Sequence, residues 1–271
     1  MSPFANREGE EFVCLEYHNG HYIGLRALQE AILICVNDLT AATSLMISRC
    51  MQGYGYIVTA EDVRANIKIL VENEYLERNQ FVTKDGHSSY SVYSLGFRGK
   101  SWLRISGVPI KCSSVMATRD TENIKKILAS NQCAIELGIF MDYKYQSYGL
   151  IKDMTKCTYH NIRMLGVAQK NEDLIYIEPI RFNKDYQKEI LIRLESIVEL
   201  RKNSIKKCLD CNIRLIYVAE DYEMMMDIMK ILSFSNYKNQ EWIFFTYDRK
   251  LVEDTDNKVF RLSMREEKEN E

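Results

Sequence analysis

Behind Thr59, apolar residues recur at the spacing of a single helix face. A repeat of about 3.6 residues places four of them together, at i, i+4, i+7 and i+8: Val63, Ile67, Leu70 and Val71. Thr59 and Asp62 have the spacing of a capping box, in which each side chain accepts a hydrogen bond from the backbone N–H of the other residue. The sequence therefore predicts a helix that begins after Thr59 and packs by one face. The opposite face is expected to be open to solvent or a ligand and holds Glu61, Arg64, Ala65 and Lys68.

A β-hairpin is predicted directly after this helix. Residues 75–78 and 81–83 have the composition of a strand, and residues 90–95 return beside it. The segment between the strands contains Asp85 and Gly86, and glycine accepts the positive φ angle that a tight hairpin turn requires. A helix that packs by one face, followed at once by a hairpin with a basic, polar tip, is typical of a winged helix.

Two further helices are predicted ahead of Thr59. Between residues 25 and 36, apolar side chains repeat at helical spacing and predict the first helix. Thr40 is expected to cap a second helix that ends at Gly53 and Gly55. Residues 12–17 are predicted to contain a short strand, and residues 97–105 a closing helix. Three helices followed by a hairpin is the order of a winged helix-turn-helix. We therefore assign residues 1–21 to an N-terminal extension and residues 22–106 to a winged helix-turn-helix domain.

A second domain is predicted after a linker at residues 107–119, which contains small residues and a proline. Within residues 120–252 the pattern predicts helices at 123–137, 184–207 and 222–232, and strands at 148–151, 162–168, 174–180, 213–218 and 242–247. This α-β-β-β-α-β-α-β order predicts a mixed α/β domain of restriction-endonuclease-like layout, with a sheet covered on both faces. The fold class is thus α+β, and the charged residues 253–271 are expected to form a disordered tail.

The composition is that of a soluble globular protein and excludes a polycation. Of the 271 residues, 46% are hydrophobic and 27% are charged, and the formal net charge is -2. Contact with nucleic acid must therefore come from a local patch. The sequence begins without the apolar segment of a signal peptide, and no apolar run approaches the roughly 18 residues of a membrane span, so we expect a cytoplasmic protein without a membrane partner. The cysteines are then expected to be reduced, with Cys35, Cys50 and Cys133 in the core.

The outer face of the third helix is the sharpest candidate site. A helix in the major groove needs side chains that contact base edges or phosphates, and a helix N-terminus can itself hold a phosphate. The residues that we expect to contact DNA are Thr59, Arg64, Asn66, Lys68, Lys84, His87 and Ser88. The alternative is a solvated face that binds protein or nothing. Four acidic residues favour that alternative because they repel phosphate: Glu61, Glu72, Glu74 and Glu77.

The second domain raises the question of a metal-dependent nuclease. In a restriction-endonuclease-like core, an Asp at the start of one strand and a Glu-x-Lys on the next hold the metal. Here the corresponding positions are Asn161 and the segment that begins at Glu178, so one carboxylate and the lysine are missing. We expect a scaffold without catalytic residues. A divergent Mg²⁺-dependent nuclease that uses Glu178 with Asp142 or Asp173 stays open as an alternative.

No metal or cofactor site is predicted elsewhere. Cys208 and Cys211 have the spacing of zinc ligands, but a structural zinc site needs four ligands and no second pair follows. The sequence also lacks a glycine-rich phosphate loop. The histidines are not spaced as ligands or as part of a catalytic triad: His18, His21, His87 and His160.

The chain resembles the replication-relaxation family of conjugative plasmids and integrative elements. The matching features are residues 28–36 as a first helix, 39–42 as the start of a second, 63–76 as a third helix that leads into the wing, and 93–96 as the closure after the hairpin. The second domain is similar in layout, with residues 174–180 as its central strand, although Asn161 stands where the family has an acidic residue. The resemblance implies an accessory DNA-binding protein of plasmid mobilisation, conjugation or replication that acts near an origin beside a relaxase.

Three functions are therefore consistent with the sequence. The first is a non-enzymatic double-stranded DNA-binding protein of a mobile element or a transcriptional regulator, for which a homodimer would fit repeated half-sites. The second is the divergent nuclease. The third is a protein-interaction adaptor or inhibitor whose winged helix binds protein.

Overall fold

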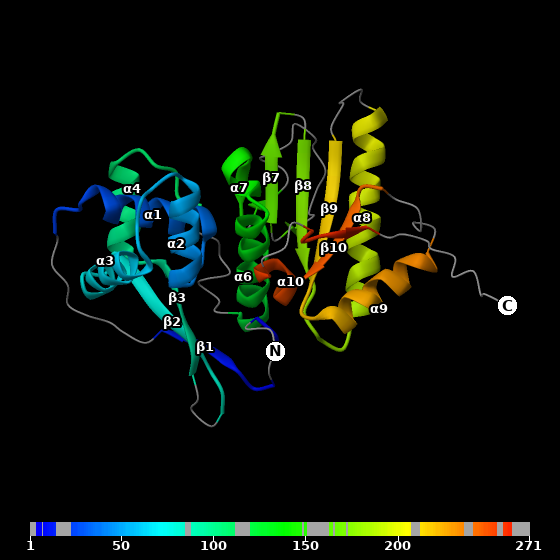
Figure 1. Ribbon diagram of the computed structural model, residues 1–271, viewed down its shortest axis with the longest axis horizontal. Helices are drawn as coiled ribbons and strands as arrows, with labels where there is room; N and C mark the ends of the chain where they lie inside the picture. The colour runs from blue at the N-terminus through cyan, green and yellow to red at the C-terminus, as the bar shows by residue number, and fades with distance from the viewer. Residues whose placement is uncertain are drawn as a thin grey trace.

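The fold is mixed α+β, and Figure 1 shows two lobes with helix α6 (Thr121–Glu136) between them. The computed structural model describes residues 4–6, 8–14, 23–84, 88–111, 120–147, 149–150, 163–164, 166–171, 173–206, 212–235, 241–253 and 257–261.

The first lobe combines a group of helices with an antiparallel sheet. The helices are α1 (Ala27–Leu39), α2 (Ser44–Gly53), α3 (Ala60–Glu72) and α4 (Phe97–Ile105), and the strands are β1 (Glu11–Cys14), β2 (Leu76–Val82) and β3 (Ser88–Leu95). The strands lie in the order β1-β2-β3. An isolated antiparallel bridge joins Ala42, between α1 and α2, to Tyr93 of β3. Residues 11–14 of the predicted extension are thus an edge strand of this sheet.

Capping residues set where the helices of the first lobe begin. The capping box predicted at Thr59 and Asp62 is confirmed, with Thr59 as the N-cap of α3. The prediction that Thr40 caps α2 was wrong, because the N-cap is Thr43, whose Oγ1 accepts a hydrogen bond of 3.3 Å from the N–H of Met46. Thr40 instead ends α1 with a φ of 62°. The chain must first extend past Ala42 to form the bridge to β3, and this delays the start of α2.

The second lobe is built on a six-stranded sheet in the order β11-β10-β9-β8-β7-β4. Strands β8, β9 and β10 are parallel to each other, and the other neighbours are antiparallel. The strands of the lobe are β4 (Lys144–Gln146), β5 (Gly149–Leu150), β6 (Arg163–Met164), β7 (Gly166–Lys170), β8 (Asp173–Pro179), β9 (Asn212–Ala219), β10 (Ile243–Tyr247) and β11 (Phe260–Arg261). Besides α6, the helices are α7 (Ile139–Asp142), α8 (Tyr186–Lys206), α9 (Tyr222–Ser233) and α10 (Asp248–Val252).

Most long elements of the second lobe match their predicted positions, and the short ones differ. The strand predicted at 148–151 contains β5, and the strand predicted at 162–168 contains β6 and the start of β7. Strands β5 and β6 pair in a separate two-stranded sheet, and β4, at the edge of the six-stranded sheet, was not predicted. The sequence pattern did not predict α7, α10 or β11. Strand β11 falls within the predicted tail, where it pairs with β10. Elements that are only 2–5 residues long are too short to show a periodic pattern from which they could be predicted.

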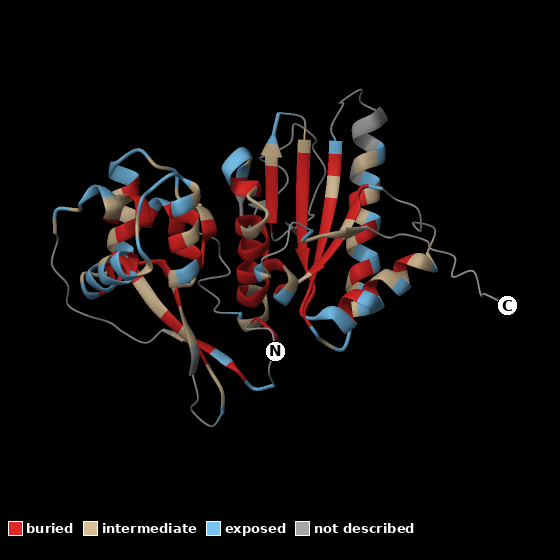
Figure 2. Cartoon of the chain, in the orientation of Figure 1, coloured by how far each residue is buried: buried red, intermediate tan, exposed pale blue. Residues whose placement is uncertain are grey.

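Helices cover both faces of the six-stranded sheet, as the continuous apolar strands predicted. On β8, Ile175 and Ile177 belong to the cluster that contains α6. Leu174 and Tyr176, which alternate with them, belong to the cluster formed with α8 and α9. Figure 2 shows the resulting buried interior of the strands and the exposed outer sides of α8 and α9. The sheet is therefore the middle layer of a three-layer lobe.

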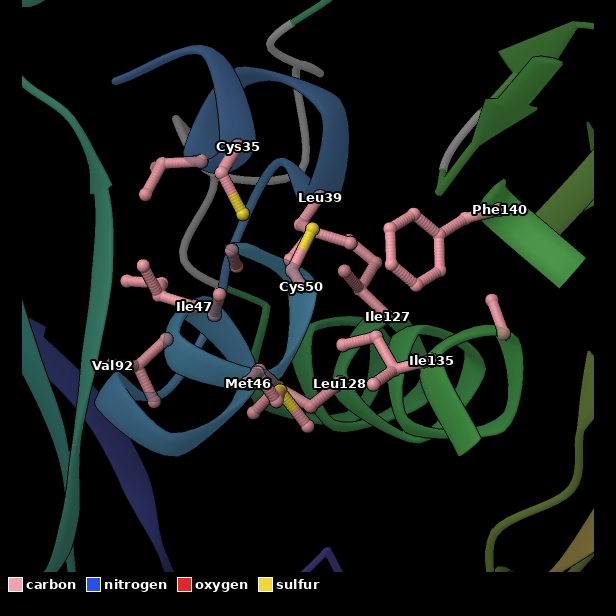
Figure 3. Close-up of a cluster of buried hydrophobic side chains, with 14 of the residues drawn as sticks. Cys35, Leu39, Met46, Ile47, Cys50, Val92, Ile127, Leu128, Ile135 and Phe140 are labelled. Carbon is pink, nitrogen blue, oxygen red and sulfur yellow. The ribbon is translucent and has the colours of Figure 1, made fainter. Parts of the chain in front are cut away.

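The two lobes share one hydrophobic core across α6. Figure 3 shows Ile127, Leu128 and Ile135 of α6, together with Phe140, beside Met46 and Cys50 of α2. Every residue from 124 to 135 is buried, including the polar ones. Because α6 packs on α2 with one side and on the sheet with the other, it has no solvent face over most of its length.

Polar contacts add to this junction. The Nδ2 of Asn131 donates to the carbonyl oxygens of Leu39 (2.8 Å) and Ala41 (2.7 Å). Its Oδ1 accepts a hydrogen bond of 3.0 Å from the hydroxyl of Tyr145. In the predicted linker, Lys111 forms an ion pair of 2.7 Å with Asp38 of α1. Residues 112–119 of the linker lie outside the described residues, and the domain boundaries stay predictions.

Within the described part of the chain, no helix is both long enough and apolar enough to cross a membrane.

Candidate nucleic-acid interface

Helix α3 lies at the surface of the first lobe with its polar face outward. The predicted apolar stripe is buried as expected and consists of Val63, Ile67, Leu70 and Val71. The other side of the helix faces solvent, as the blue segments of α3 show in Figure 2. The surface on which the DNA-binding prediction depends is therefore open and does not pack against the described residues of the second lobe.

The N-terminus of α3 is already occupied by a carboxylate of the chain. The Oγ1 of Thr59 accepts a hydrogen bond of 3.1 Å from the N–H of Asp62. In return, Asp62 Oδ2 accepts hydrogen bonds from the N–H (3.2 Å) and the hydroxyl (2.7 Å) of Thr59. These hydrogen bonds from Thr59 lower the pKa of Asp62, so the group is anionic at neutral pH. A phosphate at Thr59 would have to approach this negative charge, which makes Thr59 the weakest of the predicted contacts.

The two cations of α3 are exposed and each has an acidic neighbour on the same helix. Arg64 Nη1 lies 3.4 Å from Glu61 Oε1, and Lys68 Nζ lies 3.8 Å from Glu72 Oε1. The side chains of Arg64 and Lys68 are 61% and 77% exposed. Exposed pairs of this kind contribute only about 0 to 1 kcal/mol, so a phosphate can replace the carboxylate at small cost. The acidic residues nevertheless reduce the long-range attraction of this face for DNA.

The amide of Asn66 is partly used within the helix. Its Nδ2 donates a hydrogen bond of 2.8 Å to the carbonyl oxygen of Asp62, one turn earlier. An asparagine that recognises adenine needs both its donor and its acceptor. The bond to Asp62 uses one of the two N–H groups of the amide, so one donor and the acceptor of Asn66 remain for a base, in the orientation that this bond sets.

The hairpin adds one described cation to this surface. Lys84 is exposed two residues after the end of β2, and its side chain lies over Gly9, where a Cβ would be 2.6 Å from Lys84 Cε. His87 lies outside the described residues, and Ser88 is described only as the first residue of β3. The structure thus brings Thr59, Arg64, Asn66 and Lys68 together on α3, with Lys84 on the adjoining hairpin.

The turn between α2 and α3 is exposed, which the sequence pattern did not predict. Tyr56 is 43% exposed and Ile57 is fully exposed. Tyr54 is anchored, because its hydroxyl donates a hydrogen bond of 3.2 Å to Asp38 and its ring packs edge-on against Phe140. Apolar residues between a glycine and a helix cap can indicate an exposed turn of this kind, but the glycines here were interpreted only as the end of the second helix. Two adjacent exposed apolar side chains beside α3 favour contact with another molecule.

The acidic residues of the nuclease alternative are not brought together. Glu178 is fully buried near the carboxyl end of β8, with its Oε1 3.5 Å from Nε of Arg193. Asp173 opens the same strand, about 17 Å away at a rise of about 3.3 Å per residue. Asp142 lies near Lys170, at the same end as Asp173. Asn161 and the Cys208–Cys211 pair lie outside the described residues, as do all four histidines. Among the described residues, no group of three His, Cys, Asp or Glu side chains has the geometry of a metal site.

Burial gives Glu178 an unusual titration. Neither carboxylate oxygen has a hydrogen-bond partner among the described residues. Burial raises the pKa of this carboxyl from 4.5 to about 7, against the opposing effect of Arg193 and Lys126. The group is therefore a buried carboxyl that titrates near neutral pH.

Comparisons of the chain with protein-family models, with curated proteins and with solved structures gave no significant match.

Proposed function

We propose that this chain is a non-enzymatic protein that binds duplex DNA with α3 and the β2–β3 hairpin, in the manner of a winged helix-turn-helix. The observation on which this rests is the outward polar face of α3 beside an exposed hairpin. The bridge between Ala42 and Tyr93 supports the same interpretation, because it adds a third short strand that ties the helices to the hairpin. A role on a mobile element beside a relaxase is a further proposal that depends on the family resemblance.

The proposed docking places α3 in the major groove. The groove of B-DNA is about 12 Å wide and admits a helix. Arg64 and Lys68 are four residues apart on the exposed side, so both can reach the DNA from one face. Lys84, on the hairpin, would contact the backbone beside the groove. With a net charge of -2, the molecule depends on this local patch for its attraction to DNA.

A mobility-shift or anisotropy titration on duplex DNA at several salt concentrations tests the proposal. We expect the double variant Arg64→Ala/Lys68→Ala to bind more weakly and to lower the salt dependence by about two phosphate contacts. The matched control is Lys188→Ala/Lys202→Ala, which removes two exposed cations of α8. Binding that is unchanged in the α3 variant would refute the assignment of α3.

The acidic neighbours on α3 provide a second, opposite test. Glu61→Gln/Glu72→Gln removes the carboxylates that lie beside Arg64 and Lys68. If α3 faces phosphate, this variant binds DNA more tightly than the wild type, because two repulsive charges are lost. A decrease in affinity would be inconsistent with docking through this face.

Protein docking through the same face is the second candidate, and the exposed turn favours it. Ile57 and Tyr56 offer apolar area, and the internal ion pairs of α3 reduce its attraction for phosphate. On this alternative, Ile57→Asp abolishes partner binding in a pull-down that nuclease treatment does not affect. DNA binding that is lost in Arg64→Ala/Lys68→Ala and kept in Ile57→Asp would instead support the first proposal.

A further inference from the structure

A cavity of about 1040 Å³ lies between the two lobes, and we refer to it as the interlobe cleft. The first lobe lines it with the start of α2 and with Tyr90, Ser91 and Tyr93 of β3. The second lobe lines it with the residues that follow β9 and β10, including the start of α9 and α10. Open α/β sheets bind ligands beyond the carboxyl ends of their parallel strands, and boundaries between lobes are another frequent place for binding sites. The interlobe cleft satisfies both conditions.

One wall of the interlobe cleft is acidic and is formed by Glu220, Asp221 and Glu223. Glu220 is only 7% exposed, and its Oε1 accepts hydrogen bonds from the N–H groups of Asn6 (3.2 Å) and Phe182 (2.7 Å). Its Oε2 has no hydrogen-bond partner in the described part of the chain. The carboxylate is therefore held in place by one oxygen, and the other oxygen is available to a ligand.

The other two carboxylates of this acidic wall are also available. Asp221 caps α9 with Oδ1, which accepts a hydrogen bond of 2.9 Å from the N–H of Met224. Its Oδ2 does not take part in this cap. Glu223 is exposed and has no hydrogen bond or ion pair to any described residue. Three carboxylates at the end of one strand and the start of the next helix favour a cation.

The remaining charges of the interlobe cleft do not neutralise the acidic wall. Asp248 is paired with Arg181 at 3.0 Å, and Glu253 is paired with Lys250 at 3.0 Å. Arg249 is the cation among the residues that line the cleft. The cleft therefore has a net negative charge, and the matching ligand has a positive one.

Apolar side chains lie beside these charges. Leu45, Tyr222 and Val252 line the interlobe cleft and are each about half exposed, at 51%, 53% and 51%. The ring of Tyr222 is held edge-on against that of Tyr247, with ring centroids 5.8 Å apart. Aromatic rings next to carboxylates are suited to the aliphatic stems and cationic ends of lysine and arginine side chains.

The edge of β3 indicates that the ligand is an extended backbone. β3 is the outer strand of its sheet, and the N–H and C=O of Tyr93 point away from β2 to form bonds of 2.8 Å and 3.0 Å with Ala42. Strand alternation gives Ser91, two residues earlier, the same outward direction. No described strand pairs with β3 at Ser91 on this side. An edge of this kind is a template for an added strand.

We propose that the interlobe cleft binds an extended basic segment of a partner protein. The segment pairs as a strand with the outer edge of β3 next to Ser91. Its lysine or arginine side chains contact the acidic wall, and the intervening apolar side chains contact Leu45, Tyr222 and Val252. The site includes β3 of the hairpin but no residue of α3, so the α3 variants that test DNA binding leave it unchanged.

The test uses the full-length protein and labelled peptides of about six residues, the usual length of a strand, in which Lys or Arg alternates with Val or Tyr. Fluorescence anisotropy is expected to show binding of the basic peptide and none of its Glu-containing counterpart. Glu223→Lys is expected to weaken binding by about fivefold, because an attractive charge becomes a repulsive one. Glu195→Lys on α8, an exposed charge far along another helix, is the matched control and is expected to bind as the wild type does.

N-methylated peptides separate strand pairing from simple charge attraction. Methylation of the two peptide N–H groups that face β3 removes two hydrogen bonds and is expected to weaken binding by about tenfold. Methylation at the intervening positions leaves binding unchanged, since those groups point away from β3. The proposal is overturned if no basic peptide binds, if Glu223→Lys binds as tightly as the wild type, or if methylation has the same effect at both sets of positions.

Discussion

Glu178 makes the stability of this protein depend on pH in an unusual direction. The folded state holds the proton of this carboxyl up to a pKa of about 7, compared with 4.5 for an exposed glutamate. Between these two pH values the unfolded state therefore binds fewer protons than the folded state. The contribution of Glu178 to stability is thus fully present below about pH 4.5 and is lost as the pH rises towards 7.

The magnitude follows from the pKa difference. A change from 4.5 to about 7 corresponds to about 3 kcal/mol at about 1.4 kcal/mol per pKa unit. Glu178→Gln keeps the shape of the protonated carboxyl and cannot ionise. We expect this variant to have nearly wild-type stability at pH 5 and to be more stable than the wild type at pH 8, by at most about 3 kcal/mol.

Urea unfolding followed by circular dichroism between pH 5 and pH 8 measures this difference. The quantity to compare is the free energy of unfolding of the variant minus that of the wild type at each pH, because other groups titrate equally in both proteins. Glu195→Gln, at an exposed position of α8, is the control and should show no trend with pH. A constant difference between Glu178→Gln and the wild type across this range would refute the raised pKa and with it the argument from burial.

Three further outcomes are expected. Asn131→Ala should lower the free energy of unfolding by about 3 kcal/mol in urea titrations, because it removes three buried hydrogen bonds at the junction of the lobes, to Leu39, Ala41 and Tyr145. Thr59→Ala should lower it by about 1 kcal/mol through loss of the α3 cap while Thr59→Ser should not, and equal stability of all three proteins would contradict the capping role. Cys35, Cys50 and Cys133 are buried, and burial raises the pKa of Cys35 and Cys133, so all three should react with a disulfide reagent only as fast as the protein unfolds. Rapid labelling of the native state would contradict this.

Local sequence patterns were sufficient to predict the structure where a helix packs by one face. The period of Val63, Ile67, Leu70 and Val71 predicted the buried side of α3, and the spacing of Thr59 and Asp62 predicted its first residue. The hairpin could be predicted in the same way, because apolar and polar residues alternate along its two strands on either side of a turn segment. Such signals act between residues near in sequence, and the sequence displays them directly.

The candidate site was only partly visible in this way. The sequence indicated which side of α3 is exposed, but the pairing of Arg64 with Glu61 and of Lys68 with Glu72 depends on side-chain rotamers. The interlobe cleft was not predictable at all. It joins residues of β3 to the start of α9, more than 120 positions later in the chain, and no local pattern reports such a distance.

Helix α6 shows most clearly what the sequence determined and what only the tertiary structure decided. Its apolar spacing predicted a helix with one buried side, and the helix is present at Thr121–Glu136. The sequence did not reveal that residues 124–135 are buried on every side, because lysine, serine and asparagine in a repeat normally mark a solvent face. In the fold those polar groups meet partners from both lobes, such as the backbone carbonyls that accept from Asn131. Periodicity in sequence reports one packed face, whereas burial of the second face requires partners that only the folded chain brings into contact.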